Sequence, residues 1–284
     1  MTENVTSVVS NPAWKRLNGS GCVGFAGAGF ILLVALIAPL LSPFEPSQMA
    51  VGPRLEHPSA DHLFGTDEFG RDLFSRVLTG ARLSLGIGFV AVSFGLAFGG
   101  LLGLLAAFGG RIAESLTLRV VDVLYSFPDT LIALSLVAFL GPGIGNATLA
   151  IAISLVPFYA RVSYGLAASE RARPYIEAAR LAGIARTRLV RVHVMPNIAQ
   201  SLIVMASLGF SSAILSAAGL SFLGLGVQPP SPEWGAILAT GRNYISKAPW
   251  ILIFPGLAIC VTVLSFNLIG DSLRDIVDPK RKHN

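Results

Sequence analysis

The sequence predicts an all-α membrane protein with six transmembrane helices, and three observations lead to that prediction. Of the 284 residues, 53% are hydrophobic and only 13% are Asp, Glu, Lys or Arg, with a mean hydropathy of +0.67. That charged share is about half of the share in soluble domains, and so apolar a soluble fold would expose large patches that aggregate. The other two observations are a series of long apolar runs and an uneven distribution of positive charge between them.

Six apolar runs predict the transmembrane helices, since a bilayer core of about 30 Å needs roughly 20 residues. They cover residues 23–41, 84–108, 127–143, 147–167, 198–218 and 250–270. The first run is followed by Ser42-Pro43-Phe44 and not by a small-residue cleavage site, so we expect a retained helix. A turn signal at 141–146 separates the third and fourth runs. The fifth run leads into 219–226, which we expect to be irregular or re-entrant.

Six crossings place both termini on one side of the membrane, and the positive charge indicates which side. With Met1 in the cytoplasm, the cytoplasmic segments hold 15 of the 21 Lys and Arg residues and the external segments hold the other six. Positive residues favour the cytoplasmic side, so we expect both termini there. We attribute the net charge of +5 to this topology and to contact with anionic lipid, and we expect no nucleic-acid partner.

The expected organisation follows from these crossings. A cytoplasmic tail, 1–22, precedes the first helix, 23–41, and an extracytoplasmic segment, 42–82, follows it. Residues 83–271 form a core of five helices with a basic cytoplasmic loop at 168–196, and residues 272–284 form a second cytoplasmic tail. Within the external segment, residues 67–85 predict a separate amphipathic helix with Phe69, Leu73 and Val77 on one side. We expect it on the membrane surface or against a substrate-binding protein.

Small and hydroxyl residues mark two of the predicted spans. Gly95, Gly99 and Gly103 are spaced by four, which lets helices approach closely in lipid. We expect packing within this subunit, with contact to a partner subunit as the alternative. The fifth run contains four serines: Ser207, Ser211, Ser212 and Ser216. In one interpretation their hydroxyls bond to the backbone or to a neighbouring helix, and in the other they line the transport pathway.

Several kinds of chemistry are not expected from this chain. No Asp, Glu, Lys or Arg stands in the middle of a predicted run, although proton- or sodium-driven carriers normally need one there. The sequence has no phosphate-binding P-loop motif, and His57 and His62 do not complete a metal site. We therefore expect no catalytic residue, no metal and no cofactor bound by this chain, and an external source of energy.

The loop 168–196 carries the most specific pattern. Pro174 is suited to open a helix, Glu177 would lie in its first turn, and Gly183 is suited to the left-handed conformation that ends one. Ala178 and Ala179 leave a small-surfaced helix that another protein can approach closely. The expected result is a helix-turn-helix that seats in a socket of a partner.

This loop also resembles a known signature. Gly183 follows Glu177-Ala178-Ala179 after three intervening residues, and after nine more come two apolar positions of the signature, 193 and 195, and then Pro196. This pattern is similar to the cytoplasmic loop of permease subunits from ABC importers. Arg180 lies inside this pattern. His193 and Met195 stand where Ile and Leu are commonest in that family. The resemblance implies that the loop couples the permease to an ATPase.

Further motifs resemble the C-type permeases of dipeptide and oligopeptide importers. One external motif contains Gly65, Thr66, Asp67, Gly70, Arg71 and Asp72, whose charged members we expect to form a local ion-pair and capping cluster. The others lie at 119–128, 218–235 and 267–279, so the resemblance covers residues 62 to 279. It implies the type I importer permease fold, with the external amphipathic segment between helices 1 and 2 and a coupling helix between helices 4 and 5.

The same resemblance implies partners and a setting. It implies a second permease, two ABC ATPase subunits that hold ATP and Mg²⁺, an extracytoplasmic peptide-binding protein, and a bacterial inner or plasma membrane. Related permeases move nickel chelates, haem or glutathione, and the sequence does not separate these from peptides. Outside the family, a stand-alone secondary carrier or channel and a non-transporting scaffold remain alternatives.

Overall fold

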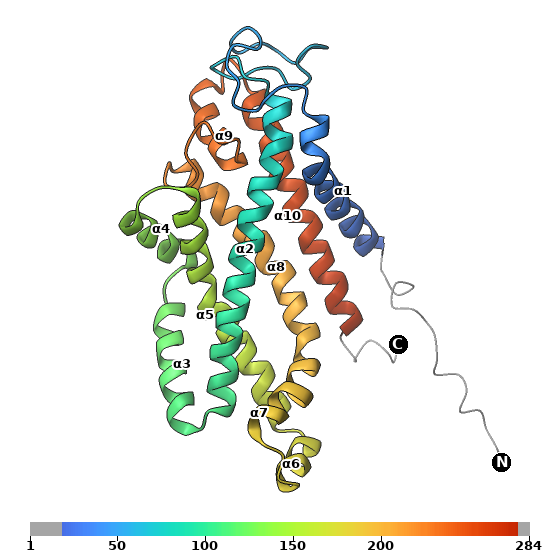
Figure 1. Cartoon of the computed structure of the whole chain (residues 1–284), viewed down its shortest axis with the longest axis vertical. Helices are drawn as coiled ribbons and strands as arrows, with labels where there is room; N and C mark the ends of the chain where they lie inside the picture. Colours follow the sequence, from blue (N-terminus) through green and yellow to red (C-terminus); the bar gives the residue numbers. More distant parts are fainter. Residues whose placement is uncertain (1–18, 278–284) are drawn as a thin grey trace, which may run out of the picture.

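The computed structural model describes residues 19–277, and the regular structure in that part of the chain is helical apart from one isolated bridge between Thr66 and Asp72. Long helices run side by side, with residues 42–72 gathered at one end and α6 at the other (Figure 1). These are called the loop end and the α6 end below. The predicted tails fall partly outside the described residues, at 1–18 and 278–284.

Ten α-helices follow in chain order within the described residues. They are α1 (Gly19–Leu41), α2 (Leu73–Phe108), α3 (Arg111–Tyr125), α4 (Asp129–Leu140), α5 (Ile144–Arg171), α6 (Pro174–Leu181), α7 (Arg186–Leu189), α8 (Met195–Phe222), α9 (Trp234–Gly241) and α10 (Trp250–Val277). A π-helical turn, Val190–Val194, joins α7 to α8, and a 3₁₀ turn, Arg242–Tyr244, follows α9. Five helices are long and apolar enough to cross a membrane, or six if α3 and α4 together count as one span.

The third predicted span is a broken one, which corrects the expected helix at 127–143. Helices α3 and α4 meet at an angle of 86°. Proline explains the break, because it disfavours helical backbone at the residue before it, here Phe127. Pro128 has an extended ψ of 133° and Asp129 begins α4. The helix ends at Leu140 because Gly141 has a positive φ of 87°.

The second span begins earlier than predicted, because the amphipathic helix expected at 67–85 starts at Leu73 and forms the first part of α2. Helix α2 is continuous from Leu73 to Phe108, and the Asp72 carboxylate caps it by accepting from the Ser75 backbone N–H at 2.8 Å. Leu73 and Val77 pack in a buried cluster with residues of α9 and α10. Their apolar side therefore contacts the rest of the chain and not the membrane surface, while Phe69 precedes the helix and is exposed.

The fifth span is also longer than the predicted 198–218. Residues Arg186–Phe222 form one continuous segment that is long and apolar enough to cross a membrane. The segment is continuous because the π-helical turn joins α7 to α8 ahead of Met195 and Pro196. The region 219–226 is helical up to Phe222 and then turns at Gly224, whose φ is +79°. The irregular part is therefore shorter than expected.

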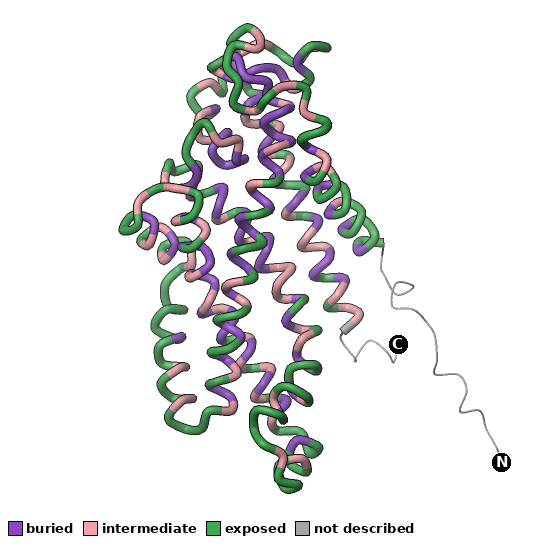
Figure 2. The backbone as a smooth tube through the Cα atoms, in the orientation of Figure 1, coloured by how far each residue is buried: buried purple, intermediate pink, exposed green. Residues whose placement is uncertain are grey.

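The core of the fold is the contact between α2 and α5. Buried residues concentrate where α2, α5 and α8 meet, whereas α3 is exposed along most of its length (Figure 2). Gly95, Gly99 and Gly103 of α2 face α5, and a Cβ atom built on Gly99 would lie 2.5 Å from the Val156 carbonyl oxygen. Only hydrogen side chains allow the two backbones to come this close. Tyr159 of α5 is fully buried beside this row.

We predict that Gly99→Ala destabilises the folded chain by about 1–3 kcal/mol, because the added methyl group overlaps the α5 backbone. Gly86→Ala in the same helix is the matched control, since nothing lies within 4 Å of a Cβ atom there. It should be neutral or slightly stabilising because Ala favours helix over Gly. Thermal unfolding of both variants in one detergent measures the difference. Equal melting temperatures would contradict the close α2–α5 contact.

Candidate functional site

Helix α6 forms a small peg at the α6 end. Pro174 opens it as predicted, and Gly183 ends it with the predicted left-handed backbone, at φ +80°. The N–H groups of Gly183 and Ile184 donate to the carbonyls of Arg180 and Ala179 at 3.0 and 3.2 Å, the bonding pattern of a Schellman cap. The helix is therefore short and sharply defined at both ends.

The outer side of this peg is exposed, and its inner side is anchored. Glu177, Ala178 and Arg180 are exposed and Ala179 is partly buried. Leu181, at the tip, has 84% of its surface exposed, which is unusual for a leucine outside the membrane spans. On the inner side Ile176 is fully buried, in a cluster with residues from α2, α5, α7 and α8. This arrangement suits a helix that inserts into another protein while it stays fixed to the rest of its own chain.

Polar bonds fix the peg to α5 and α8, and a further bond ties the end of α5 to the end of α2. The Tyr175 hydroxyl donates to the Glu170 carboxylate of α5 and accepts from the Asn197 side-chain amide of α8 at 3.0 Å. Arg171 donates to the Ala107 carbonyl at the end of α2. The peg is therefore bonded directly to α5 and α8, and it contacts α2 through the buried cluster around Ile176.

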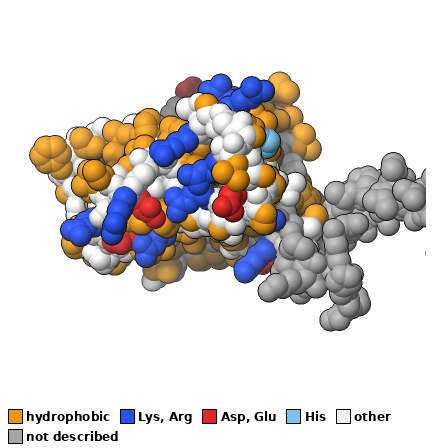
Figure 3. Space-filling view, turned by 90° about the horizontal axis from the view of Figure 1, so that it is seen from below, with side chains coloured by type: hydrophobic (Ala, Val, Ile, Leu, Met, Phe, Trp, Pro, Cys, Tyr) orange, Lys and Arg blue, Asp and Glu red, His pale blue; other side chains and the backbone are white. Residues whose placement is uncertain are grey.

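Arginines surround the peg. Figure 3 views the molecule from the α6 end and shows blue side chains gathered on this face. Five arginines of the loop are exposed: Arg173, Arg180, Arg186, Arg188 and Arg191. Apart from the bond of Arg173 to Glu170 at 3.0 Å, this loop presents mainly positive charge to its surroundings.

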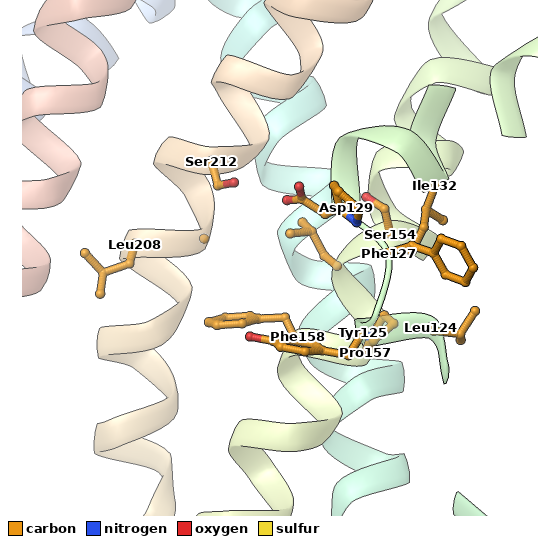
Figure 4. Close-up of a pocket in the computed structure, with 13 residues that line it drawn as sticks. Leu124, Tyr125, Phe127, Asp129, Ile132, Ser154, Pro157, Phe158, Leu208 and Ser212 are labelled. Carbon is orange, nitrogen blue, oxygen red and sulfur yellow. The ribbon is translucent and has the colours of Figure 1, made fainter. Parts of the chain in front are cut away.

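Two cavities follow α8 at mid-height of the molecule. The first has a volume of about 370 Å³ and lies between the α3–α4 break, α5 and α8. Figure 4 shows Asp129, Ser154 and Ser212 on one side of it and Tyr125, Pro157 and Phe158 on the other. The second, of about 460 Å³, continues along α4 and α8 to Leu223 and shares Asp129 and Ser212 with the first. Together they form a track along the outer half of α8, the half nearer the loop end.

The four serines of α8 separate into two pairs. Ser207 donates to the Val204 carbonyl at 2.8 Å, and Ser211 donates across to the Val263 carbonyl of α10 at 3.1 Å. Ser212 and Ser216 instead line the track. Each pair is spaced by four residues, so each occupies its own side of the helix. The backbone-bonding interpretation therefore holds for Ser207 and Ser211, and pathway lining stays a prediction for Ser212 and Ser216.

Asp129 corrects the expectation that no charged residue stands in the middle of a span. It lies at the break between α3 and α4, which together make up the third span. Sequence reasoning placed it near the end of a straight helix at 127–143 and so missed it, together with Tyr125 and Phe158. The one signal that pointed to this region is proline inside apolar runs, at Pro128 and Pro157.

The external motif forms a buried polar cluster that joins the loop end to α2. Asp67 is 2% exposed and accepts from the Arg71 Nε at 2.5 Å and from the Arg71 backbone N–H at 3.0 Å. The Arg76 Nε lies 3.5 Å from the same carboxylate. Burial raises the pKa of the neighbouring Glu68, which also pairs with Arg71 at 3.1 Å. These contacts are the ion-pair cluster that the sequence predicts.

The remaining members of the motif tie this cluster to other parts of the chain. The second carboxylate, Asp72, pairs with the His62 Nδ1 at 3.0 Å in addition to capping α2. The Thr66 hydroxyl donates to the Pro53 carbonyl, and the Trp250 indole N–H of α10 donates to the Thr66 carbonyl at 3.2 Å. Gly65 and Gly70 have positive φ values of 75° and 69°. His62 is thus a structural partner, and no group of three metal-ligating side chains exists among residues 19–277.

The known proteins that this chain resembles are membrane components of transport systems. Residues 99–283 match the family described as binding-protein-dependent transport system inner membrane component. The chain is 46% identical over 272 residues to the dipeptide transport system permease protein DppC of Alkalihalophilus pseudofirmus, covering 95% of this chain and 90% of the relative. It is 48% identical to the di/tripeptide transport system permease protein DppC of Pseudomonas aeruginosa, covering 95% and 92%.

A third relative is named for a different transported compound, and a solved structure supports the fold. The glutathione transport system permease protein GsiD of Pectobacterium atrosepticum is 42% identical, covering 95% of this chain and 90% of the relative. A chain of the inward-facing MetNI methionine ABC transporter superposes with a TM-score of 0.59 at 20% identity, covering 72% of this chain and 97% of that one. At that identity the structural likeness bears on the fold alone.

We predict that Asp67→Asn destabilises the folded chain by about 3–5 kcal/mol, because removing one partner leaves buried arginine charge uncompensated. Asp61→Asn is the matched control, since Asp61 is exposed in the same loop. Thermal unfolding of the two purified variants in detergent measures the effect. A melting temperature for Asp67→Asn as high as that of the control would show that the cluster does not hold the loop end together.

Proposed function

The chain belongs to the family of binding-protein-dependent transport system inner membrane components, and from that membership we propose that it is the permease subunit of an ATP-driven ABC importer for dipeptides or oligopeptides. It is a multi-pass inner-membrane protein of the type I importer permease fold. Within the complex it forms half of the wall of the translocation pathway. The observation that carries the coupling part of this proposal is the peg α6, which is exposed at its tip, bonded to α5 and α8, and packed against the end of α2.

The proposed coupling is mechanical. The face formed by Glu177, Ala178, Ala179 and Arg180 seats in a socket on an ATPase subunit, with Gly183 and Pro196 fixing the direction of the chain around it. Closure of the ATPases on ATP moves the peg, and the bonds of Tyr175 and Glu170 carry that movement into the long helices. Rigid-body transmission of this kind needs no catalytic residue in this chain.

The proposed complex supplies the parts that this chain lacks. A permease of an ABC importer works with ATPase subunits, a partner permease and a substrate-binding protein, and we propose one partner permease, two ATPases and one extracytoplasmic peptide-binding protein. ATP and Mg²⁺ bind to the ATPase subunits. The track along α8, with Ser212 and Ser216 in its lining, is the proposed share of this chain in the pathway.

The proposed orientation places the α6 end and both termini in the cytoplasm. The exposed arginines of 168–196 support it, because positive charge is retained on the cytoplasmic side and is attracted to its anionic lipids. The loop end, with the cluster of Asp67 and Arg71, then faces the binding protein. The membrane is proposed to be a bacterial inner or plasma membrane.

Glutathione is a second candidate cargo. The relative from Pectobacterium atrosepticum is named for glutathione, which is itself a short peptide, and two others are named for dipeptides or di- and tripeptides. Nickel chelates and haem remain alternatives from the family resemblance. Competition of each unlabelled compound against uptake of a labelled dipeptide by the reconstituted complex separates these cargoes.

We predict that Gly183→Val uncouples ATP hydrolysis from uptake. A branched residue at φ +80° costs about 1–3 kcal/mol, which shifts the peg out of its cap geometry. Uptake per ATP should fall about tenfold or more in vesicles that contain the complete complex, and Glu177→Lys should act in the same direction by reversing charge on the peg. Labelled dipeptide uptake and phosphate release are measured on the same vesicles.

Gly110→Val is the matched control for this prediction. Gly110 also has a positive φ, +94°, and open space around it, but it lies in the α2–α3 turn outside the peg. Its coupling ratio should stay close to that of the wild type. Normal coupling in both peg variants, or equal loss in all three, would refute the assignment of α6 as the coupling element.

A further inference from the structure

Asp129 is the one charged residue among the described residues that line the two cavities along α8. It belongs to both cavities, so it lies where they join. Their volumes of about 370 and 460 Å³ fall in the range of sites that enclose small molecules. A carboxylate at membrane depth is costly unless it has a partner or faces a water-filled path, and it usually marks the path of a solute.

No partner for this charge exists within the described chain. Asp129 takes part in none of the ion pairs formed by residues 19–277. One of its oxygens accepts the neighbouring Thr130 N–H at 2.7 Å, as expected at the first turn of a helix. The ion pair in its vicinity, Asp122 with Arg161, lies outside both cavities. No side-chain cation among the described residues therefore neutralises this charge, which faces the track.

The rest of the first cavity also favours a cation. Tyr125 and Phe158 present aromatic rings, whose faces attract ammonium groups. Pro157 has no N–H, so the Ile153 carbonyl lacks its usual helical donor. Ser154 donates to the Ile151 carbonyl at 2.9 Å and so keeps oxygen lone pairs for another donor. Carboxylate, ring faces and oxygen acceptors together match a group that only donates hydrogen bonds, such as –NH₃⁺.

We propose that Asp129, with Tyr125 and Phe158, binds the α-ammonium group of the cargo peptide on its way along α8. This inference rests on the proposed function, which supplies a cargo with such a group. The second cavity, which continues from Asp129 to Leu223 with mainly apolar walls, receives the rest of the peptide. Asp129 is thus a specificity-determining residue of the permease, acting after release from the binding protein.

The charge of the cavity can be measured without knowing the cargo. In the assembled complex, Cys22 and Cys260 are replaced by Ser and Ser212 by Cys, and the new thiol is treated with a cationic and with an anionic methanethiosulfonate reagent. We expect the ratio of the cationic to the anionic rate to fall about tenfold or more when Asp129→Asn is added, since a nearby charge acts oppositely on the two reagents. An unchanged ratio would overturn the proposal.

Uptake tests the ligand itself. Vesicles with the complete complex and saturating binding protein take up labelled Ala-Ala, and Asp129→Asn should lower that rate about tenfold while Asp129→Glu restores most of it. Asp271→Asn is the matched control, because Asp271 is exposed at the far end of α10. ATP hydrolysis without binding protein should be the same in all three variants and in the wild type.

The outcomes separate this inference from the proposed function. If the wild-type complex shows no ATP-dependent uptake of Ala-Ala, the proposed cargo fails and the ligand assignment fails with it, whereas the reagent ratio still decides the charge of the cavity. If the wild type transports and Asp129→Asn transports equally well, only the inference is overturned. If Asp129→Asn separates the two permeases during purification, the carboxylate pairs with the partner subunit and the inference is also overturned.

Discussion

The close contact of α2 with α5 is the constraint on which the rest of the structure depends. In lipid the hydrophobic effect does not drive helices together, so tight van der Waals packing between small residues has to do so. Gly95, Gly99 and Gly103 give α5 a fixed position against α2. Both proposed functional parts depend on that position, because α5 contributes Ser154 and Phe158 to the cavity and Glu170 to the peg.

The parts of this protein that local chemistry determines could be predicted from the sequence. Pro174 and Gly183 define the two ends of α6 through backbone rules that act within a few residues, and the carboxylate of Asp67 reaches Arg71 four residues away. The parts set by contacts distant in sequence could not be predicted. Leu73 and Val77 have the pattern of a surface helix, and only the presence of α9 and α10 over them shows that they are buried.

The α3–α4 break illustrates why hydropathy alone misplaces Asp129. An apolar run of sufficient length predicts one straight span. Proline, however, disfavours helical backbone at the residue before it, so Pro128 opposes a helix that is continuous through Phe127. At the break the Phe127 N–H donates to the Leu124 carbonyl and Pro128 has no N–H, so the helical bonding of α3 does not continue into α4. The same bend that interrupts the span therefore accounts for the cavity beside it, and it turns Asp129 toward α8.

The peg and the track are connected by continuous helices, and the proposed coupling depends on that connection. Helix α8 runs from Met195 beside the peg to Phe222 at the loop-end side of the track, and α5 passes the cavity and ends at the bonds of Glu170. Packed helices are stiff and close-packed cores resist gradual deformation. Under the proposed function, a shift of Tyr175, held between these two helices, changes the angle between them and not their shape, so the width of the track between α8 and α4 is the quantity that coupling is proposed to control.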